Sequence, residues 1–387
     1  MKKTTFSRRR FASGIALAVG GFSLRGGRDL LAQAVDPSAM SPGGRVAPDQ
    51  YDALVKLCFN ENPYGPSNAV LQAMNGAFKY ANRYGYPDGG LVQAIAAHHG
   101  VNPENVVVGA GSTEILCIAG DTFLTGGKKV IGVEPTFNSV YEHATGLKAD
   151  AIRLPLRGDF QQDIPAMIRT AKEHAHETGF IYLCNPNNPT GAIVTKDEVR
   201  QLLEGISENI PVLIDEAYHH FADNPAYASS TPLVLEGRPV LVTRTFSKIA
   251  ALAGMRLGYG IAPANLIRQM RPYSDSSCVN ALAKYAGVAS LKDSAGEEKV
   301  RRDIIATRRK TIAELEGLGY KVIPSEANFF MVDVRRDVQP VIQAFRERGI
   351  LVGRPFPPMM QHLRVSVGTP GEMEQFMGAF KAVVVTG

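Results

Sequence analysis

The sequence predicts an α/β protein: a large domain with a mainly parallel, seven-stranded sheet covered by helices, plus a smaller α+β domain. Short apolar runs alternate with helix-like segments between residues 106 and 261, which is typical of a parallel sheet with helices on both faces. The runs are continuous in Val, Ile and Leu, as expected of strands that are buried on both sides. After Pro263 the pattern changes, so we expect a second domain near that point.

The strands and helices of the large domain follow directly from these runs. The predicted strands are Val106–Val108, Val130–Val133, Ile152–Leu154, Phe180–Cys184, Val212–Ile214, Val240–Val242 and Leu257–Ile261. The predicted helices are Ala69–Tyr80, Leu91–His99, Thr113–Phe123, Phe137–Thr145, Ile164–His176 and Lys196–Glu208.

The rest of the chain mixes both kinds of element. The predicted helices there are Leu282–Leu291, Glu297–Leu315, Val338–Arg348 and Gly371–Val384. The predicted strands are Tyr320–Ile323, Phe329–Val334, Ile350–Val352 and Leu363–Val367. We therefore assign residues 69–265 to the large domain, and residues 57–68 together with 266–387 to the small one.

Composition and charge exclude some classes of function. The chain has 387 residues, 45% hydrophobic and 20% charged, which is ordinary for a two-domain globular protein. The net charge of +5 comes from residues 1–34, which hold seven Lys or Arg and one Asp; residues 35–387 hold 35 basic and 36 acidic side chains. No basic excess therefore favours nucleic acid. None of the four cysteines lies in a CxxC pair, so we expect buried free thiols, and no His/Cys cluster has metal-site spacing.

Residues 1–34 resemble a twin-arginine (Tat) signal peptide. A basic start leads into Ser7–Phe11, SRRRF, followed by a weakly apolar run at Ile15–Phe22 and a small-residue cleavage site at Ala32–Ala34. The apolar run is too short to cross a bilayer. We therefore expect the Tat translocon to carry the folded protein to the periplasm, with residues 35–56 as a flexible lead-in.

The stretch Thr243–Gly258, TRTFSKIAALAGMRLG, carries a lysine, Lys248, and no acidic residue. A lysine that can lose its proton attacks carbonyls and forms Schiff bases. Ser247 and Arg256 offer a hydroxyl and a bidentate cation, which suit a phosphate. An aldehyde and a phosphate together describe pyridoxal 5′-phosphate (PLP). The alternative is a surface lysine at a strand end with an arginine on a helix.

Two further motifs follow predicted strands. Val108–Glu114, VGAGSTE, opens a helix, where backbone N–H groups and the hydroxyls of Ser112 and Thr113 can bind an anion. Asn185–Gly191, NPNNPTG, lies where parallel sheets bind ligands, and an Asn there can donate to a phenolic oxygen. The alternatives are a tight connection for the first motif and a plain Asx turn for the second.

Val212–Tyr218, VLIDEAY, places Asp215 at the end of a buried strand. An acid there is costly unless it has a cationic partner. A protonated pyridine nitrogen would be such a partner, and Tyr218 could reach the same ring. The alternative is an aspartate that caps the N-terminus of a helix.

Eight motifs occur in the order found in one family. They are NENPYGPS, YPDGG, GAGSTE, EPTF, NPNNPTG, IDEAY, FSKIAALAGMRLG and HLRVSVGT. With them the chain resembles the fold-type I PLP-dependent aminotransferases of class I/II, and within these the histidinol-phosphate aminotransferase branch. The resemblance runs from Leu57 to the C-terminus, and the combination is highly specific although single motifs are not.

The resemblance implies a role for each matching residue. Lys248 corresponds to the lysine that forms the Schiff base and then moves a proton between Cα and C4′, and Asp215 to the acid that keeps the pyridine nitrogen protonated. The other residues implied to contact the cofactor are Tyr218 and Asn188 at O3′, Phe137 on the ring, and Gly111, Ser112, Thr113, Ser247, Arg256 and Tyr86 (or Tyr84) of a second subunit at the phosphate. The residues implied to bind substrate are Arg364, at its carboxylate, Asn188 and Tyr64.

The sequence also departs from the family. The turn Tyr84–Asp88, YGYPD, carries extra residues, so it is open which of Tyr84 and Tyr86 crosses a dimer. Histidine synthesis is cytoplasmic, so the predicted export argues against that pathway. His219 and His220 could touch substrate, or they could be plain loop residues.

Taken with the resemblance, these residues predict a homodimeric, PLP-dependent transaminase. It would move an amino group between an amino acid, or an amine-bearing metabolite, and a 2-oxo acid. The alternative is a PLP-dependent lyase, racemase or decarboxylase on the same scaffold, because the fold does not determine the reaction. A third hypothesis, a non-catalytic PLP-binding regulator, lacks a visible DNA-binding motif. We expect no metal.

Overall fold

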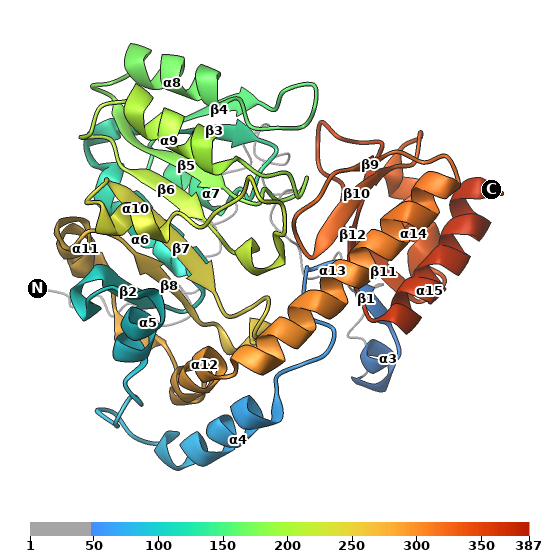
Figure 1. Ribbon diagram of the computed structural model, residues 1–387, viewed down its shortest axis with the longest axis horizontal. Helices are drawn as coiled ribbons and strands as arrows, with labels where there is room; N and C mark the ends of the chain where they lie inside the picture. The colour runs from blue at the N-terminus through green and yellow to red at the C-terminus, as the bar shows by residue number, and fades with distance from the viewer. Residues whose placement is uncertain (1–47, 387) are drawn as a thin grey trace, which may run out of the picture. The chain divides into compact units, whose positions relative to one another are not determined.

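The computed structural model describes residues 48–386. The predicted signal peptide and most of the predicted lead-in lie outside these residues. The chain divides into a unit that ends at Leu54 and a compact unit that begins at Val55. The first contains the short helix α3 (Pro48–Asp52), and the second contains all the strands of the described residues (Figure 1).

All seven predicted strands form one sheet, in the order β2-β8-β7-β6-β5-β3-β4. The strands are β2 (Val106–Gly109), β3 (Lys129–Glu134), β4 (Ala151–Pro155), β5 (Thr178–Cys184), β6 (Val212–Asp215), β7 (Val240–Thr245) and β8 (Gly258–Ile261). The five strands from β3 to β7 are all parallel to one another. Strand β8 is antiparallel to both of its neighbours, β2 and β7. The predicted large, mainly parallel sheet is therefore confirmed.

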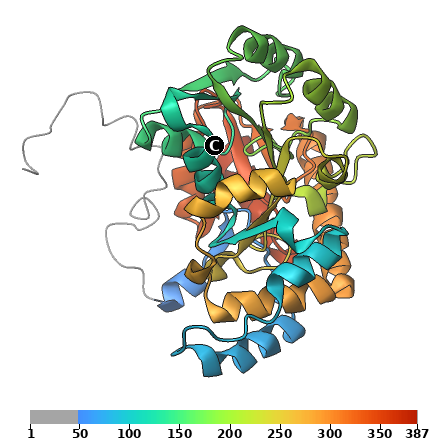
Figure 2. The ribbon, with the colours of Figure 1, turned by 90° about the vertical axis from the view of Figure 1, so that its left-hand side faces the viewer.

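Helices cover both faces of this sheet. One face packs against α5 (Leu91–His99), α8 (Ile164–Glu173), α9 (Lys196–Gly205), α10 (Thr231–Leu235) and α12 (Ala281–Lys292). The other face packs against α6 (Ser112–Phe123), α7 (Ser139–Gly146) and α11 (Ala264–Met270). Helix α4 (Asn68–Ala77) lies beside α12 (Figure 2). Side chains along a strand alternate between the faces: Ile181 faces α8 and α9, whereas Tyr182 faces α6 and α7.

Local capping explains why two of the helices begin where they do. At the start of α9, the Thr195 hydroxyl accepts from the Glu198 N–H at 3.2 Å, and the Glu198 carboxylate accepts from the Thr195 N–H at 2.9 Å. Thr369 and Glu372 repeat the arrangement at the start of α15 (Pro370–Phe380). Such reciprocal bonds satisfy two backbone donors that a helix start leaves free.

Two small sheets and three helices share a second core. Strand β1 (Val55–Leu57) pairs in parallel with β11 (Ile350–Val352), and β10 (Phe329–Asp333) lies between β9 (Val322–Ile323) and β12 (His362–Ser366) in an antiparallel sheet. These strands pack against α13 (Ser294–Gly317), α14 (Val338–Arg346), α15 and the terminal π-helical turn η9 (Lys381–Val385). The aromatic rings at the centre of this core are those of Phe330, Phe345, Phe376 and Phe380.

The structure differs from the sequence predictions in several places. The predicted lead-in, 35–56, contains α3 and the first residues of β1. Strand β1 has no local sequence signal, because its pairing partner β11 lies far away in the sequence. Helices α10 and α11 are short and were not predicted. Helix α11 spans the predicted boundary at residue 265 and α12 follows it, yet both pack on the large sheet, so the core changes later along the chain than that boundary. All four cysteines are free as expected, but only Cys58 and Cys184 are buried, whereas Cys117 is partly exposed and Cys278 is exposed.

Among residues 48–386, no helix combines the length and the apolar composition that crossing a membrane requires.

The aromatic core around Phe376 yields a stability prediction. Phe376 is fully buried and its ring stacks on Phe345 with 5.4 Å between centroids. We expect Phe376→Ala to lower the free energy of unfolding by about 3–5 kcal/mol, because the cavity that it leaves collapses only partly. Denaturant unfolding followed by circular dichroism measures the change. Leu235→Ala, at a side chain that is 62% exposed, is the control, and an equal loss in both variants would contradict the assigned core.

Candidate active site

The predicted site residues gather where parallel strands of the large sheet end. Cys184 and Asp215, the last residues of β5 and β6, lie opposite each other, and Asp215 also lies opposite Thr243 of β7. The chain then continues into the loops that carry Asn188 and Lys248. Open α/β sheets bind ligands beyond the carboxyl ends of their strands, so this edge is the expected place for a site.

Asp215 is a buried acid, 2% exposed, with three hydrogen bonds. Its carboxylate accepts from the Ala217 N–H and the Thr243 hydroxyl, both at 3.2 Å, and from the Tyr182 hydroxyl at 3.5 Å. Within the described residues it forms no ion pair. Burial raises the pKa of Asp215 from 3.8 to about 6. The acid is therefore placed to receive a cation from outside the chain.

Lys248 lies in the loop after β7 and faces the same site. Its Nζ donates to the Phe59 carbonyl oxygen at 3.0 Å and lies 5.6 Å from the centroid of the Tyr218 ring. Burial lowers the pKa of Lys248 to about 8, and the charge of Arg364 acts in the same direction. A lysine with such a pKa is partly deprotonated near neutral pH and can act as a nucleophile or a base.

The hydroxyl of Tyr218 is held by two amides. It accepts from Asn60 Nδ2 at 3.2 Å and from Asn188 Nδ2 at 3.3 Å. The Oδ1 of Asn188 accepts from the Arg364 guanidinium at 2.6 Å, so Asn188 links Tyr218 to Arg364. Asn60 is fixed in turn by Ser366, whose hydroxyl accepts from the Asn60 N–H at 2.8 Å and donates to its Oδ1 at 2.9 Å.

Arg364, on β12, brings a buried guanidinium to the site; the residue is 6% exposed. It donates to the Cys58 carbonyl oxygen at 2.6 Å and lies over the rings of Phe329 and Phe356 at 5.5 and 4.7 Å. Its buried Nε has no hydrogen-bond partner, and the residue forms no ion pair within the described chain. Burial lowers the pKa of Arg364 to about 10. This cation therefore has unused capacity for an anion.

A second guanidinium, that of Arg354, lies over the same Phe356 ring at 4.4 Å. It donates to the Pro355 carbonyl oxygen at 2.9 Å. Two cations thus share one aromatic ring beside Asn188, which makes this part of the site suitable for anionic groups.

The start of α6, Ser247 and Arg256 meet on the α6 face of the sheet. Arg256 donates to the Ser247 hydroxyl at 3.3 Å. Gly111, with φ of 86°, directly precedes α6, and a Cβ there would collide with the Arg256 guanidinium. A Cβ on Gly258 would likewise collide with the Ser112 backbone N–H. The two glycines thus let a helix N-terminus, a hydroxyl and a cation come together, which are the donors that bind phosphate.

The remaining predicted residues lie less centrally. Thr113 follows Ser112 in the first turn of α6, and Phe137 packs beside the core on the α6 face. The other three are tyrosines whose contacts lie away from Lys248. The Lys299 ammonium lies over the Tyr64 ring, Tyr86 donates to the Val279 carbonyl oxygen and stacks on Tyr80, and Tyr84 is fully exposed.

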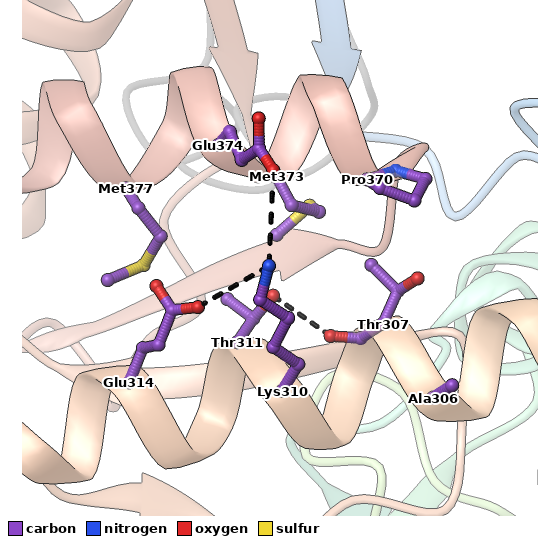
Figure 3. Close-up of a pocket in the computed structure, with 9 residues that line it drawn as sticks. All are labelled: Ala306, Thr307, Lys310, Thr311, Glu314, Pro370, Met373, Glu374 and Met377. Carbon is purple, nitrogen blue, oxygen red and sulfur yellow. Dashed lines mark hydrogen bonds and ion pairs between the residues drawn. The ribbon is translucent and has the colours of Figure 1, made fainter.

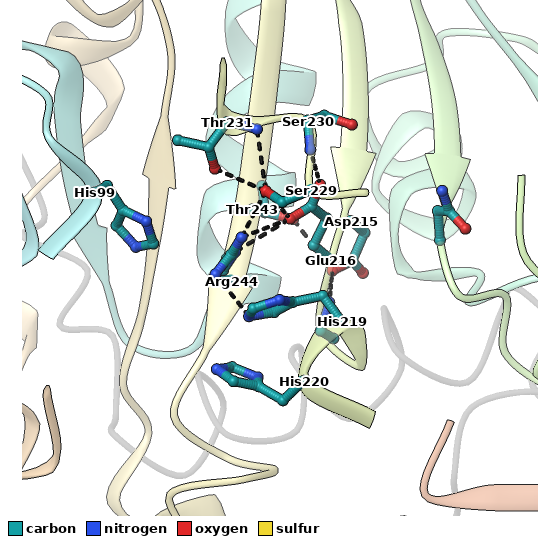
Figure 4. A network of polar contacts seen from close by, with 12 residues as sticks. His99, Asp215, Glu216, His219, His220, Ser229, Ser230, Thr231, Thr243 and Arg244 are labelled. Atoms are coloured by element: carbon teal, nitrogen blue, oxygen red, sulfur yellow. Dashed lines mark hydrogen bonds and ion pairs between the residues drawn. The ribbon is translucent and has the colours of Figure 1, made fainter. Parts of the chain in front are cut away.

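Two other features lie apart from this site. His219 and His220 lie beside Arg244, on the opposite side of β7 from Thr243 (Figure 4). A pocket between α13 and α15 is lined by none of the predicted site residues, and Lys310 Nζ there lies 3.8 and 3.9 Å from Glu314 and Glu374 (Figure 3). In the described chain, no group of three or more His, Cys, Asp or Glu could hold a metal ion.

The family model for aminotransferase class I and II matches residues 52–380. The chain belongs to this family. The aminotransferase is 36% identical over 337 residues to a histidinol-phosphate aminotransferase of Moorella thermoacetica, covering 86% of each chain. It is 35% identical to one of Symbiobacterium thermophilum, covering 86% of this chain and 91% of the relative.

Solved structures agree on the fold of this aminotransferase. The histidinol-phosphate aminotransferase of Sinorhizobium meliloti, solved in complex with pyridoxal 5′-phosphate, superimposes with a TM-score of 0.80 at 23% identity, over 92% of this chain and 98% of that one. Family membership makes the protein a PLP-dependent transaminase with amino acids and 2-oxo acids as substrates.

Three residues of the aminotransferase site were not assigned roles from the sequence. Asn60 lies in NENPYGPS, but its bond to Tyr218 depends on Ser366, which is 306 residues away. Arg354 follows an ordinary strand, and only the Phe356 ring places it near Arg364. Thr243 lies within β7 and bonds Asp215, yet the predicted strand stopped at the last apolar residue, Val242. Tertiary contacts place all three.

The buried carboxylate of Asp215 gives this aminotransferase a pH-dependent stability when the cofactor is absent. Because its pKa rises from 3.8 to about 6 on folding, the protonated acid favours the folded state, and that contribution is lost as the pH rises from about 4 to about 6. The rise corresponds to about 3 kcal/mol at most. We expect Asp215→Asn to raise the Tm of the cofactor-free protein above pH 6 and to change it little near pH 4.

Thermal unfolding over a pH series measures this gap between Asp215→Asn and wild type. Asp159 is the matched control, because its exposed carboxylate bonds Arg157 and its pKa is lowered. Asp159→Asn should give no gain at any pH. A gap at Asp215 that does not vary with pH would contradict the raised pKa.

Proposed function

We propose that this aminotransferase uses Asp215, Lys248 and Arg364 as the three charged groups that meet cofactor and substrate. One observation carries the proposal: all three are held in the same site, and none forms an ion pair within residues 48–386. Buried charges are costly unless they are paired. The cofactor would bring a protonated ring nitrogen to Asp215 and an aldehyde to Lys248, and the substrate would bring a carboxylate to Arg364.

The residues of the site fit PLP. When bound, this cofactor supplies an electron-accepting ring that stabilises negative charge on the substrate Cα. Asp215 would hold the proton on the ring nitrogen, and Tyr218 and Asn188 would donate toward the phenolic oxygen. Phe137 would stack on the ring. The phosphate would be held by Gly111, Ser112, Thr113, Ser247 and Arg256, whose close approach the two glycines permit.

Lys248 would act both as the carbonyl-reactive amine and as the base. Its Nζ would take the proton from the substrate Cα and deliver it to C4′ of the cofactor. The Phe59 carbonyl and the Tyr218 ring hold this nitrogen in place. A pKa of about 8 suits the role, because a base works best when its pKa is close to the working pH.

Arg364 would bind the substrate carboxylate, with Asn188 orienting the guanidinium. Arg354, across the Phe356 ring, adds a second cation. We infer that at least one substrate carries a further anionic group, a second carboxylate or a phosphate. The two curated relatives are named for a phosphorylated amine substrate, which agrees with this inference. Tyr64 is also proposed to contact the substrate.

We further propose a homodimer in which a tyrosine of one subunit reaches the cofactor phosphate of the other. Tyr86 remains the first candidate, although its hydroxyl bonds Val279 of its own chain. Tyr84 is the other candidate, because its side chain is 102% exposed and free to contact a partner.

Transamination and the alternative PLP reactions differ in stoichiometry. We expect the purified, cofactor-loaded enzyme, mixed with a single amino acid and no added 2-oxo acid, to release one 2-oxo acid per active site and then stop. Lys248→Ala should abolish that release. Quantifying the 2-oxo acid and ammonia tests both points, and each amino acid tried identifies or excludes a donor. Continuous ammonia release would indicate a lyase, and normal turnover by Lys248→Ala would remove the proposed base.

We propose export through the Tat pathway from residues 1–34, which precede the described chain. Replacing Arg8, Arg9 and Arg10 by Lys keeps the charge but removes the arginines that define such a signal. Cell fractionation should find the wild type in the periplasm and the variant in the cytoplasm, with equal transaminase activity in both. Equal distribution of the two proteins would contradict the proposal.

A further inference from the structure

We propose that the buried ion pair of Arg244 and Glu216 is a positioning device that holds the loop carrying Asp215 and Tyr218 in the geometry required for PLP. The inference rests on the roles proposed above for these two residues. It concerns side chains that touch neither cofactor nor substrate.

The pair lies on the opposite face of the sheet from the cofactor site. Along β7, Val240 and Val242 pack on the α5 face and Leu241 on the α6 face. Thr243 continues the α6 series and bonds Asp215 at 3.2 Å. Arg244 therefore points to the α5 face, where Figure 4 shows it among Glu216, His219 and Ser229.

The Arg244 guanidinium contacts the loop from Asp215 to His219 at two residues. Its Nε and a terminal nitrogen donate to Glu216 Oε2 at 3.2 and 2.8 Å, and its other terminal nitrogen lies 2.6 Å from His219 Nε2. Glu216 directly follows Asp215, and His219 directly follows Tyr218. Asp215 and Tyr218 are thus each next to a residue that the Arg244 guanidinium contacts on the opposite face of the sheet.

Glu216 is anchored on every side. Its carboxylate also accepts from the Ser230 N–H at 2.6 Å and from the Ser229 hydroxyl at 3.0 Å, and its backbone N–H donates to the Thr243 carbonyl oxygen at 2.9 Å. The residue is 1% exposed. In contrast to Asp215 and Arg364, this pair is fully satisfied within the chain and offers nothing to a ligand.

The chemistry of the pair favours a geometric role. Apolar side chains of similar volume would often stabilise a core as well as a buried ion pair does. A planar guanidinium with several directed donors, however, fixes the direction of what it bonds. Along the loop, Asp215 and Tyr218 are each followed directly by a side chain that Arg244 contacts, Glu216 and His219, so a shift of Glu216 or His219 would displace its neighbour.

Arg244→Lys tests the inference, because lysine keeps the charge but loses the fork that bonds Glu216 and His219 together. We expect the dissociation constant for PLP, measured by titrating the cofactor-free protein well below its Tm, to rise about tenfold, the lower end of the effect of orienting residues in metal sites. The visible circular dichroism per bound PLP should weaken, because the ring is held less firmly. Ser229→Ala, which removes one bond to each member of the pair, should shift both readouts in the same direction.

Arg200→Lys is the matched control, since Arg200 forms a surface pair with Glu236 at 2.9 Å and should leave both readouts unchanged. A lower Tm for Arg244→Lys with unchanged PLP affinity and circular dichroism would show a purely structural pair and overturn the inference. If Arg244→Lys does not fold, the PLP affinity and visible circular dichroism of Ser229→Ala and Glu216→Gln test the inference instead.

Asp215→Asn, measured in the same titration, separates this inference from the proposed function. If Asp215→Asn weakens PLP binding while Arg244→Lys, Ser229→Ala and Glu216→Gln do not, the positioning role alone fails. If Asp215→Asn leaves the affinity unchanged, the role proposed for Asp215 fails and the positioning inference fails with it.

Discussion

The burial of the Asp215 carboxylate is the constraint on which the rest of the site depends. A carboxylate removed from water needs hydrogen bonds and a cation. Within residues 48–386, Asp215 accepts hydrogen bonds from Tyr182, Thr243 and Ala217 but forms no ion pair, and the charge of Lys248 favours its carboxylate only in part. Its pKa of about 6 shows that the protein alone does not fully stabilise the charge. A buried carboxylate without an ion-pair partner is expected in a protein whose cofactor supplies the cation.

The fold places the residues proposed to meet the cofactor on one face of the large sheet and the residues that position them on the other. On the α6 face, Asp215, Thr243 and Ser247 surround the space proposed for the cofactor. On the α5 face, Arg244 and Glu216 form a pair that is satisfied within the chain. The alternation of side chains along β6 and β7 makes this division possible. Arg364 then arrives from β12, in the second core, and its link to Tyr218 through Asn188 joins the two cores at the site.

Much of this arrangement could be predicted from the sequence, because its signals are local. Continuous apolar runs marked all seven strands of the large sheet, and the motifs after them brought Asn188, Asp215 and Lys248 to one edge. Other features have no local signal. Strand β1 exists only through its pairing with β11. Arg244 follows the predicted strand Val240–Val242 and was given no role, because its partners Glu216, His219 and Ser229 lie on other segments. Helix α12 looks like a small-domain helix until its packing on α4 is known.

The most direct test of the account is the protonation state of the cofactor's ring nitrogen in the assembled enzyme. Nitrogen NMR of the wild type loaded with ring-labelled PLP should show a protonated nitrogen at neutral pH, and the signal should become that of an unprotonated pyridine in Asp215→Asn. An unprotonated ring in the wild type, or a protonated ring that survives in Asp215→Asn, would contradict the claim that the buried carboxylate of Asp215 is completed by the cofactor.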